Sequence, residues 1–400
     1  MIEFKDIVSD EFSKKMPLRF YPRKLRIKVE KEFVTPARAV IDSEYKNKMN
    51  FPNQIKFDDY VSISVQYFTE QKLQSFLNEN GAMKKLSDNV SQFSKSATDS
   101  YLSVLSLRPQ KSAWPELNEK QFGRFIRFLN IVQGGLNTRS LPNISVNFDY
   151  KTAVKEFCTQ YQEFNPIVWL DLREDDPHIF QKKIDLLKNM VKNKQLQIIG
   201  FYAGKTDTFD QYNVNLDYVY TEFKDEEVLL LYEGSYKAFS NQYIGVSKLH
   251  YHPFEVFDVI SPYKFIRGGN GKEGETYLEK AKNTSFLDTD DVSLKKFQNM
   301  DKTKIDMYLK HIDKKSRGTM DEIVDKIEHS QELEEIEYRK FASFANTQQV
   351  VAGENEIKEL SKRIENGDTL DYLEEKKDLK NEVVNRLSLK NSHYTLDEYK

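Results

Sequence analysis

Residues 167–204 have the sequence "IVWLDLREDDPHIFQKKIDLLKNMVKNKQLQIIGFYAG", in which two apolar runs flank one amphipathic segment. The runs 167–173 and 196–204 are continuous and rich in aliphatic residues, which is typical of strands buried on both faces of a parallel sheet. Between them, Asp176 and Pro177 form a helix start signal, and apolar residues then recur at helical spacing. The stretch therefore predicts a strand–helix–strand unit.

The same alternation of strand-like and helical segments extends in both directions from this unit. The candidate strands are residues 33–41, 61–68, 143–149, 167–173, 196–204, 228–234, 243–247 and 256–261. Eight such strands with intervening helices predict an α/β fold of the (β/α)8 TIM-barrel type. An open, doubly wound sheet is the rival, but no strand is followed by a G-x-G-x-x-G turn, and the sequence contains no P-loop.

The predicted domain boundary lies near residue 270. We expect residues 1–270 to form the barrel, with a basic N-terminal strand and a helical insertion at about 70–140. Residues 271–400 contain charge-dense segments with mixed signs and apolar residues at helical spacing, which predict a charged helical appendage. The appendage could also pair with a second copy of the chain, which would give a homodimer.

The composition limits the class of protein. The chain has 400 residues, 39% of them hydrophobic, and a formal net charge of −3. It contains a single cysteine, Cys158, which excludes a disulfide within the chain and a cysteine-based structural zinc site. The N-terminus shows no signal peptide, and no apolar run approaches the roughly 20 residues of a membrane span. We therefore expect a cytoplasmic protein without a membrane partner.

Several predicted strands end in polar or charged residues. Asp171 ends one run, Tyr202 and Gly204 end the next, and Glu233 and Gly234 end a third. In a barrel of this type the catalytic groups come from the carboxyl ends of the strands and the loops that follow. Two carboxylates close together could serve as nucleophile and acid/base, which is the arrangement that glycosyl transfer needs.

The run at 256–261 contains a further carboxylate, Asp258, and basic residues follow it. A second basic region, residues 14–31, precedes the first predicted barrel strand. These positive charges either form solvated faces of exposed segments or contact phosphates of a nucleic acid. The candidate phosphate-contacting residues are Lys264, Arg267, Arg23, Lys24 and Arg26.

The segment "FDVISPYKFIRGG" resembles the nucleophile motif of the tRNA-guanine transglycosylases and their relatives that insert 7-deazaguanine bases into DNA. The residues that match that motif are Phe257, Asp258, Pro262, Arg267 and Gly269. Three further segments resemble family motifs in the same order along residues 20–270: "TPARAV" from Thr35, "TDSYLSVLSL" from Thr98 and "YIGVS" from Tyr243. The family has the (β/α)8 fold, so the resemblance implies the same architecture.

The resemblance implies a base-exchange reaction in which guanine in DNA or tRNA is replaced by a 7-deazapurine base. Asp258 would attack the anomeric carbon of the sugar, and Asp99 would transfer protons on the leaving and entering bases. No cofactor is implied. The expected substrate-binding residues are Asp171, Tyr202, Gly204, Glu233 and Gly234. The chain departs from the family where Asp99 lacks the following glycines and glutamine, and where the cysteine-rich zinc site is absent.

Two alternatives to base exchange remain open. The barrel could be a non-catalytic scaffold whose charged C-terminal helices bind a partner. The protein could also be a metal-dependent hydrolase, because His250 and His252 would point the same way on a strand and could share a metal with Glu255 or Asp258.

Overall fold

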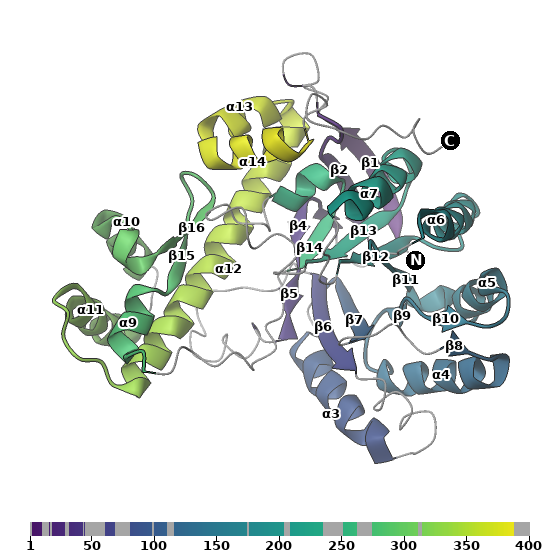
Figure 1. The fold of residues 1–400 in the computed structure, drawn as a ribbon, viewed down its shortest axis with the longest axis horizontal. Coiled ribbons are helices and arrows are strands. Elements are labelled where there is room, and N and C mark those ends of the chain that lie inside the picture. The colour runs from purple at the N-terminus through teal and green to yellow at the C-terminus, as the bar shows by residue number, and fades with distance from the viewer. Residues whose placement is uncertain are drawn as a thin grey trace.

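The structure of the chain is a computed structural model with a mixed α/β fold. It describes residues 2–9, 16, 18–28, 32–42, 44, 61–68, 81–97, 100–109, 116–173, 176–203, 209–234, 251–261, 274–310 and 314–387. Within these residues, parallel strands form the centre, and helices α3 to α7 form an arc around them (Figure 1).

The largest parallel sheet among the described residues has six strands. In spatial order they are β4 (Ala37–Arg38), β14 (Val259–Ser261), β13 (Leu229–Glu233), β12 (Ile198–Tyr202), β11 (Pro166–Asp171) and β9 (Arg139–Leu141). Every neighbouring pair is parallel. Parallel neighbours need a crossover connection, usually a helix. The helices that connect β9 to β13 are α5 (Tyr150–Gln160), α6 (Pro177–Lys192) and α7 (Phe209–Phe223).

The second parallel sheet has three strands and continues the first. Its strands are β5 (Val40–Ile41), β6 (Val61–Phe68) and β7 (Leu102–Pro109). Only Ala39 separates β4 from β5. The segment 37–41 therefore pairs with β14 on one side, where Ala37 is opposite Val259, and with β6 on the other, where Val40 is opposite Ser62.

The helices begin at side chains that cap their first turns. The side chain of Asp176 accepts from the backbone N–H groups of His178 and Ile179 at the start of α6, and Pro177 occupies the first turn. Asn118 and Gln121 form a reciprocal capping box at the start of α4 (Glu119–Val132). Helix α3 (Gly81–Ser96) precedes β7. These local signals determine where α4 and α6 begin.

Alternating residues of the strands contribute to two separate apolar clusters. The inner core contains Ile63, Val104, Trp169, Leu231 and Val259, among others, and joins strands of both sheets. The outer core contains the alternate strand residues together with apolar residues of the surrounding helices, including Leu105, Val168, Leu170, Phe201, Phe125, Phe157 and Ile184. Because side chains alternate across a strand, the side chains on one face of the sheets form the inner core, and those on the other face pack against helices in the outer core.

A small antiparallel sheet covers the amino ends of the parallel strands. Its strands are β1 (Glu3–Ser9), β2 (Arg23–Lys28) and β3 (Glu32–Val34). Ile2 forms backbone hydrogen bonds with the side chain of Gln197, which directly precedes β12. Leu25 and Ile27 of β2 belong to the inner core. The basic N-terminal strand therefore closes one end of the sheets.

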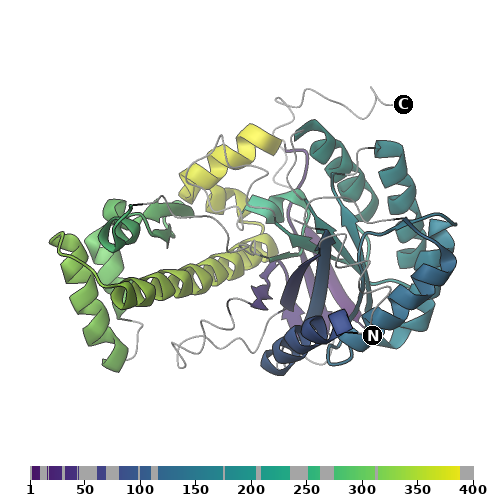
Figure 2. The same cartoon turned by 60° about the horizontal axis from the view of Figure 1, so that its bottom comes forward.

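A C-terminal module with its own core follows β14. Its elements are α9 (Tyr277–Lys282), β15 (Ser285–Asp288), β16 (Ser293–Lys296), α10 (Lys302–Leu309), α11 (Lys314–Glu328) and the first turns of α12 (Glu335–Asn366). The cluster combines aliphatic and aromatic side chains, and in it Phe286 contacts Phe341 and Phe344. Figure 2 shows α12 extending from this module to the central strands.

The last helices return to the main body of the protein. Ser361 of α12 donates a hydrogen bond to the backbone oxygen of Thr35 at 2.9 Å. Tyr372 of α13 (Thr369–Glu375) and Val383 of α14 (Lys377–Leu387) belong to the outer core. The predicted boundary at residue 270 thus needs a correction. The second half of α12 and both following helices are part of the main body, and only the module before them has a separate core.

The strand predictions were right in part. β6, β11, β12, β13 and β14 lie within or overlap predicted strands. The predicted strand 143–149 is wrong, because only Ser145–Val146 is extended there, and it pairs with β8 (Glu116–Leu117) in a separate two-stranded parallel sheet. β7 and β9 take part in the sheets although their residues were predicted as helix or loop. The predicted strand 243–247 lies outside the described residues.

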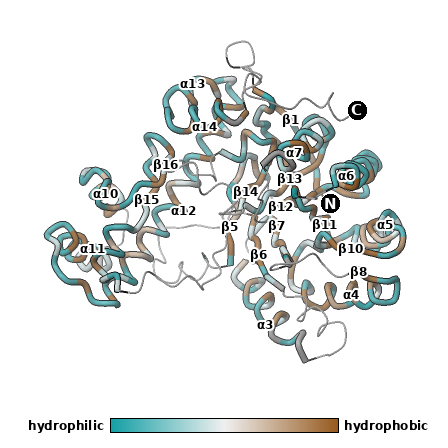
Figure 3. Tube along the Cα trace, viewed as in Figure 1, coloured by the Kyte–Doolittle hydropathy of each residue, from teal (hydrophilic) through white to brown (hydrophobic). Residues whose placement is uncertain are grey.

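The hydropathy of the chain follows this architecture. Apolar residues concentrate along the central strands, whereas the helices alternate between apolar and polar residues (Figure 3). Among the described residues, no helix combines the length and apolar character that crossing a membrane requires.

Candidate functional site at the carboxyl ends of the strands

Polar side chains occupy the carboxyl ends of four strands on the inner face. On β13, Leu229 and Leu231 belong to the inner core, and Glu233 is the next residue on that face. The same alternation places Asp171 above Trp169 on β11, and Tyr202 at the end of β12. On β7, Ser106 and Arg108 follow Val104. These five polar residues, which we call the rim cluster, are Ser106, Arg108, Asp171, Tyr202 and Glu233.

A buried ion pair lies at the centre of the rim cluster. Arg108 Nε lies 2.8 Å from Glu233 Oε2, and the two side chains are 4% and 0% exposed. Arg108 Nη2 also donates to the backbone oxygen of Glu233 at 2.7 Å, and the hydroxyl of Ser106 donates to Glu233 Oε2. Burial opposes the charge of Arg108, but the charge of Glu233 and its polar neighbours outweighs burial, so the pKa of Arg108 is raised.

Tyr202 and Asp171 complete the rim cluster. The guanidinium of Arg108 lies 4.5 Å from the centre of the Tyr202 ring. Burial raises the pKa of Tyr202 well above that of an ordinary tyrosine, and the charge of Asp171 adds to the shift, so the hydroxyl stays neutral. The side chain of Asp171 is 16% exposed, and its Oδ2 lies 2.7 Å from Arg173 Nη2. The cluster thus combines two carboxylates, one guanidinium group and two hydroxyls, with Arg173 as a further partner of Asp171.

The structure brings together three of the predicted substrate-binding residues, Asp171, Tyr202 and Glu233. Gly234 lies beside them, where its N–H donates to the backbone oxygen of Ser261 at 3.4 Å. Gly204 lies outside the described residues. The sequence-based reasoning missed Ser106 and Arg108. The alternation in "LSVLSLRP" (102–109) is the signal that could have revealed a strand with a charged residue at its end.

The predicted nucleophile, Asp258, lies at the opposite end of the sheet. It directly precedes β14, and it is fully buried. Its Oδ1 and Oδ2 accept hydrogen bonds from Arg23 at 2.9 and 2.7 Å, and Oδ2 also accepts from the backbone N–H of Leu230 at 2.7 Å. Burial raises the pKa of Asp258, although Arg23 and Leu230 oppose the shift. Asp258, which was predicted to lie within a strand at 256–261, thus lies just before β14 and away from the carboxyl strand ends.

The partner of Asp258 also organises the amino end of the sheet. Arg23 is 3% exposed. Its guanidinium donates to the backbone oxygens of Phe223 at the end of α7 and of Val228, which directly precedes β13, at 2.5 and 2.7 Å. The pair Arg23–Asp258 therefore joins β2, α7, β13 and β14 at one buried point. This arrangement is a structural tie at the amino end of the sheet.

Two other predicted basic residues, Lys24 and Arg26, form ion pairs within the chain. Lys24 is 6% exposed and contacts Glu365 of α12, and Arg26 also contacts Glu365, at 3.2 Å. Arg23 and Lys24 are therefore not part of an exposed basic surface, contrary to the prediction of phosphate contacts. Three predicted functional residues, Asp99, Lys264 and Arg267, lie outside the described residues.

Only one histidine of the pair that suggested a metal site, His252, lies within the described residues. His250 lies outside the described residues. His252 is buried, and its Nδ1 lies 2.5 Å from Glu255 Oε2. In the described part of the chain, no group of three or more histidine, cysteine or acidic side chains has the geometry to hold a metal ion.

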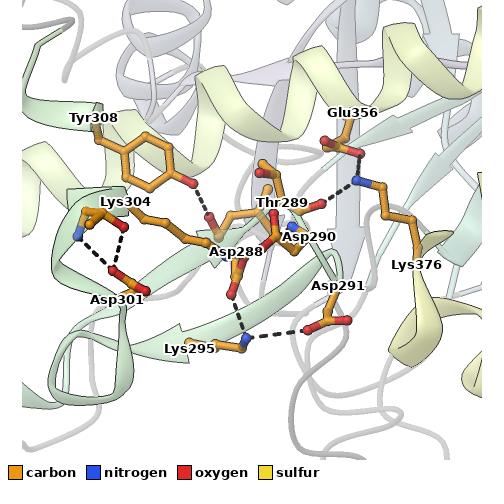
Figure 4. Close-up of polar contacts among 12 residues, drawn as sticks. Asp288, Thr289, Asp290, Asp291, Lys295, Asp301, Lys304, Tyr308, Glu356 and Lys376 are labelled. Atoms are coloured by element: carbon orange, nitrogen blue, oxygen red, sulfur yellow. Dashed lines mark hydrogen bonds and ion pairs between the residues drawn. The ribbon is translucent and has the colours of Figure 1, made fainter. Parts of the chain in front are cut away.

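A second polar cluster lies in the C-terminal module, around Asp288 (Figure 4). Lys295 Nζ and Lys304 Nζ each lie 2.5 Å from a different oxygen of this carboxylate, whose side chain is 4% exposed. Burial alone would raise the pKa of Asp288, but the two lysines outweigh it and lower the pKa. Both carboxylate oxygens are occupied, so the cluster ties the β15–β16 hairpin to α10.

We expect Asp288→Asn to lower the free energy of unfolding by about 1–2 kcal/mol at pH 7, because two buried charge-assisted contacts are lost. The folded carboxyl has the lower pKa, so its contribution is complete above the unfolded pKa of about 3.9 and is lost as the pH falls through the folded value. Urea unfolding at pH 7 and pH 3 should show the difference from wild type shrinking at pH 3. Asp290→Asn is the matched control, because its side chain is 71% exposed.

Comparisons with known proteins found little similarity to this chain. No protein-family model matches the chain, and no curated protein matches it. A solved structure of 3-dehydroquinate dehydratase from Enterococcus faecalis is similar over 51% of this chain and 81% of that chain, with 8% sequence identity and a TM-score of 0.33. This level of similarity carries no argument about fold or function. The site is therefore interpreted from its own geometry.

Proposed function

We propose that the two parallel sheets form one closed (β/α)8 barrel. The segment 37–41 already joins them at one side. At the other side, the backbone N–H of Ser103 on β7 donates to Asn137 Oδ1, and Thr138 Oγ1 donates to the backbone oxygen of Ser103, both at 2.7 Å. Asn137 and Thr138 directly precede β9. These contacts bring β7 beside β9, and the inner core joins strands of both sheets.

We further propose that the rim cluster is the site of an enzyme that transfers a glycosyl group from a nucleoside-type glycosidic bond. The observation that carries this proposal is the buried Arg108–Glu233 pair at the carboxyl strand ends. A buried ion pair is often no more stabilising than apolar residues of the same volume, because both charges lose hydration. Charged groups at this end of a barrel are instead typical of catalytic sites.

The spacing of the two carboxylates supports glycosyl transfer. Asp171 and Glu233 come from β11 and β13, which flank β12. Neighbouring strands lie about 4.8 Å apart, so the two backbones are separated by about 10 Å. Both side chains extend from the inner face, and enzymes that displace a glycosidic group directly place their carboxyl groups about 6.5–9.5 Å apart. The strand positions of Asp171 and Glu233 are therefore compatible with that separation of the carboxyl groups.

The two carboxylates then have different roles. Glu233, held by Arg108 and Ser106, is an anion placed to stabilise positive charge on the sugar in the transition state. Asp171 is partly exposed and would accept the proton of the entering nucleophile. The proposed reaction class is the one predicted from the sequence. The catalytic roles, however, belong to residues that were predicted to bind the base rather than to Asp258 and Asp99. DNA, tRNA and a 7-deazaguanine base remain the first substrates to test.

We expect Glu233→Gln to lower the rate of base release or exchange by about 10²-fold or more, because an amide cannot stabilise the sugar cation electrostatically. The assay incubates the protein with DNA, tRNA or purine nucleosides, with and without labelled 7-deazaguanine, and measures free base and incorporated label. Glu163→Gln, on an exposed side chain, is the matched control. Circular dichroism establishes that each variant is folded.

Two outcomes would contradict this proposal. Equal turnover by the wild type and by a folded Glu233→Gln protein would show that the rim cluster does not take part in the reaction. Absence of turnover and of any thermal shift with all of these ligands would instead favour the scaffold alternative, in which the barrel has no substrate.

A further inference from the structure

A cavity of about 450 Å³ lies between helices α5 and α6. These helices are neighbours in the arc that surrounds the central strands (Figure 1). Most of the residues that line the cavity are exposed, so it opens at the surface of the helix layer, whereas the rim cluster lies on the inner face of the strands. The lining residues are Lys151, Lys155, Leu186, Asn189, Met190, Asn193 and Gln195.

The C-terminal turn of α6 shapes one end of the cavity. Lys194 has a φ of 57°, and its N–H donates to the backbone oxygen of Val191 at 2.9 Å. The N–H of Gln195 donates to the backbone oxygen of Met190, also at 2.9 Å. This pair of bonds is a Schellman motif. Carbonyl groups at a helix C-terminus carry partial negative charge and would repel an anion. Two of these carbonyls are therefore occupied by hydrogen bonds within the chain.

The charge of the lining is positive. Lys151 and Lys155 lie four residues apart on α5, so their side chains share one face of the helix. Neither forms an ion pair with another described residue, and no described lining residue is acidic. The acidic residue before them, Asp149, accepts from backbone N–H groups at the start of α5. By contrast, Lys188 of α6, which does not line the cavity, pairs with Glu222. The cavity therefore favours an anion.

The rest of the lining suits an organic molecule. Met190 is 2% exposed, and with the half-buried Leu186 it provides an apolar surface. The side chains of Asn189, Asn193 and Gln195 are carboxamides, which both donate and accept hydrogen bonds. Small-molecule sites typically have volumes of about 300–1,000 Å³, so the cavity is large enough for more than a single inorganic ion.

We propose that the cavity binds a nucleoside monophosphate. The phosphate lies between Lys151 and Lys155, because two ammonium groups match the charge of a phosphate dianion. The base packs on Met190, and its polar edge forms hydrogen bonds with the carboxamides. This site is separate from the rim cluster, and the inference does not rest on the proposed glycosyl transfer.

Isothermal titration calorimetry on the full chain at low ionic strength tests the ligand. The probes are AMP, GMP, adenosine and inorganic phosphate. We expect one molecule of AMP or GMP to bind per chain, and adenosine and inorganic phosphate to bind at least about 10-fold more weakly, because each lacks one half of the contacts. The affinity for the nucleotide should fall as salt is added, since salt screens exposed charges.

Two variants place the nucleotide in the cavity. Lys151→Gln/Lys155→Gln should weaken nucleotide binding by about 10-fold or more, because both counter-charges are lost. Lys120→Gln/Lys182→Gln is the matched control, because it removes the same charge from exposed lysines outside the cavity. Asn189→Trp keeps both lysines and fills part of the cavity with an indole, so it should abolish binding. Circular dichroism establishes that each variant is folded.

The outcomes separate this inference from the proposed function. If the wild type binds neither nucleotide, or if Asn189→Trp binds it unchanged, the site is wrong. Equal affinities for inorganic phosphate and AMP would overturn the nucleotide as ligand. Nucleotide binding that Glu233→Gln weakens and Lys151→Gln/Lys155→Gln leaves unchanged would place the nucleotide at the rim cluster. That result would overturn the inference and leave the proposed function standing.

Discussion

Asp258→Asn should lower the free energy of unfolding by about 3–5 kcal/mol, the loss expected when one partner of a buried ion pair is removed. The substitution leaves the guanidinium of Arg23, which is 3% exposed, without a counter-charge. It also weakens the contact with the N–H of Leu230 and so loosens the joint between β2, α7 and β13. Urea unfolding followed by circular dichroism measures the change.

The control for this prediction lies on the same small sheet. Glu32→Gln removes the partner of Lys5, but both side chains are more than a third exposed, so a change of about 0–1 kcal/mol is expected. The double variant Arg23→Met/Asp258→Leu removes both buried charges and should be more stable than Asp258→Asn. The outcome that would restore Asp258 as the nucleophile has two parts. The wild type would form a covalent adduct with nucleic acid, and an Asp258→Asn protein of unchanged stability would form none.

The position of Asp258 shows what an apolar run leaves undetermined. The run 256–261 was predicted as one strand, but β14 begins only at Val259. Val256 has a φ of 82°, a left-handed conformation that β-branched residues rarely adopt, so the chain turns within the run. Which end of a strand carries a carboxylate depends on where the turn falls and on register with neighbouring strands. Neither is encoded in local hydropathy.

The elements with strong local signals were predictable. Helix α6 begins after Asp176 as its capping signal indicates, and β6 has the predicted bounds 61–68. β7 was missed because Ser103 and Ser106 interrupt its apolar residues, so it does not form a continuous apolar run. Because β7 was not predicted, Arg108, the partner of Glu233, was missed as well. The sequence therefore indicated Glu233 but not Arg108.

The C-terminal helices were misjudged because their exposed faces are densely charged. The prediction treated residues 271–400 as one appendage, yet Leu360, Ile364 and Tyr372 pack into the outer core of the main body. Apolar residues at helical spacing show that a helix has a buried face, but they do not show which surface covers it. That information comes from contacts between distant segments, such as Ser361 with Thr35.

Gly200→Ala should destabilise the protein by about 3 kcal/mol or more, at the upper end of the cost of overpacking a core. Gly200 on β12 is opposite Trp169 on β11, whose ring is 1% exposed in the inner core. A Cβ at residue 200 would lie 2.3 Å from Trp169 Cδ2 and 2.4 Å from Cε3, far inside van der Waals contact. Because these ring atoms belong to a rigid indole among packed strands, the indole or the strands must shift.

A double-variant cycle assigns this cost to the indole. In a Trp169→Val background, the added methyl group fills part of the space that the ring vacates, so Gly200→Ala should then cost far less than in the wild type. Gly123→Ala is the matched control, because a Cβ there meets no atom within 4 Å and alanine favours the helix α4. Denaturant unfolding of all variants gives the coupling energy. Equal costs of Gly200→Ala in both backgrounds would mean that Trp169 does not pack against Gly200 in the inner core.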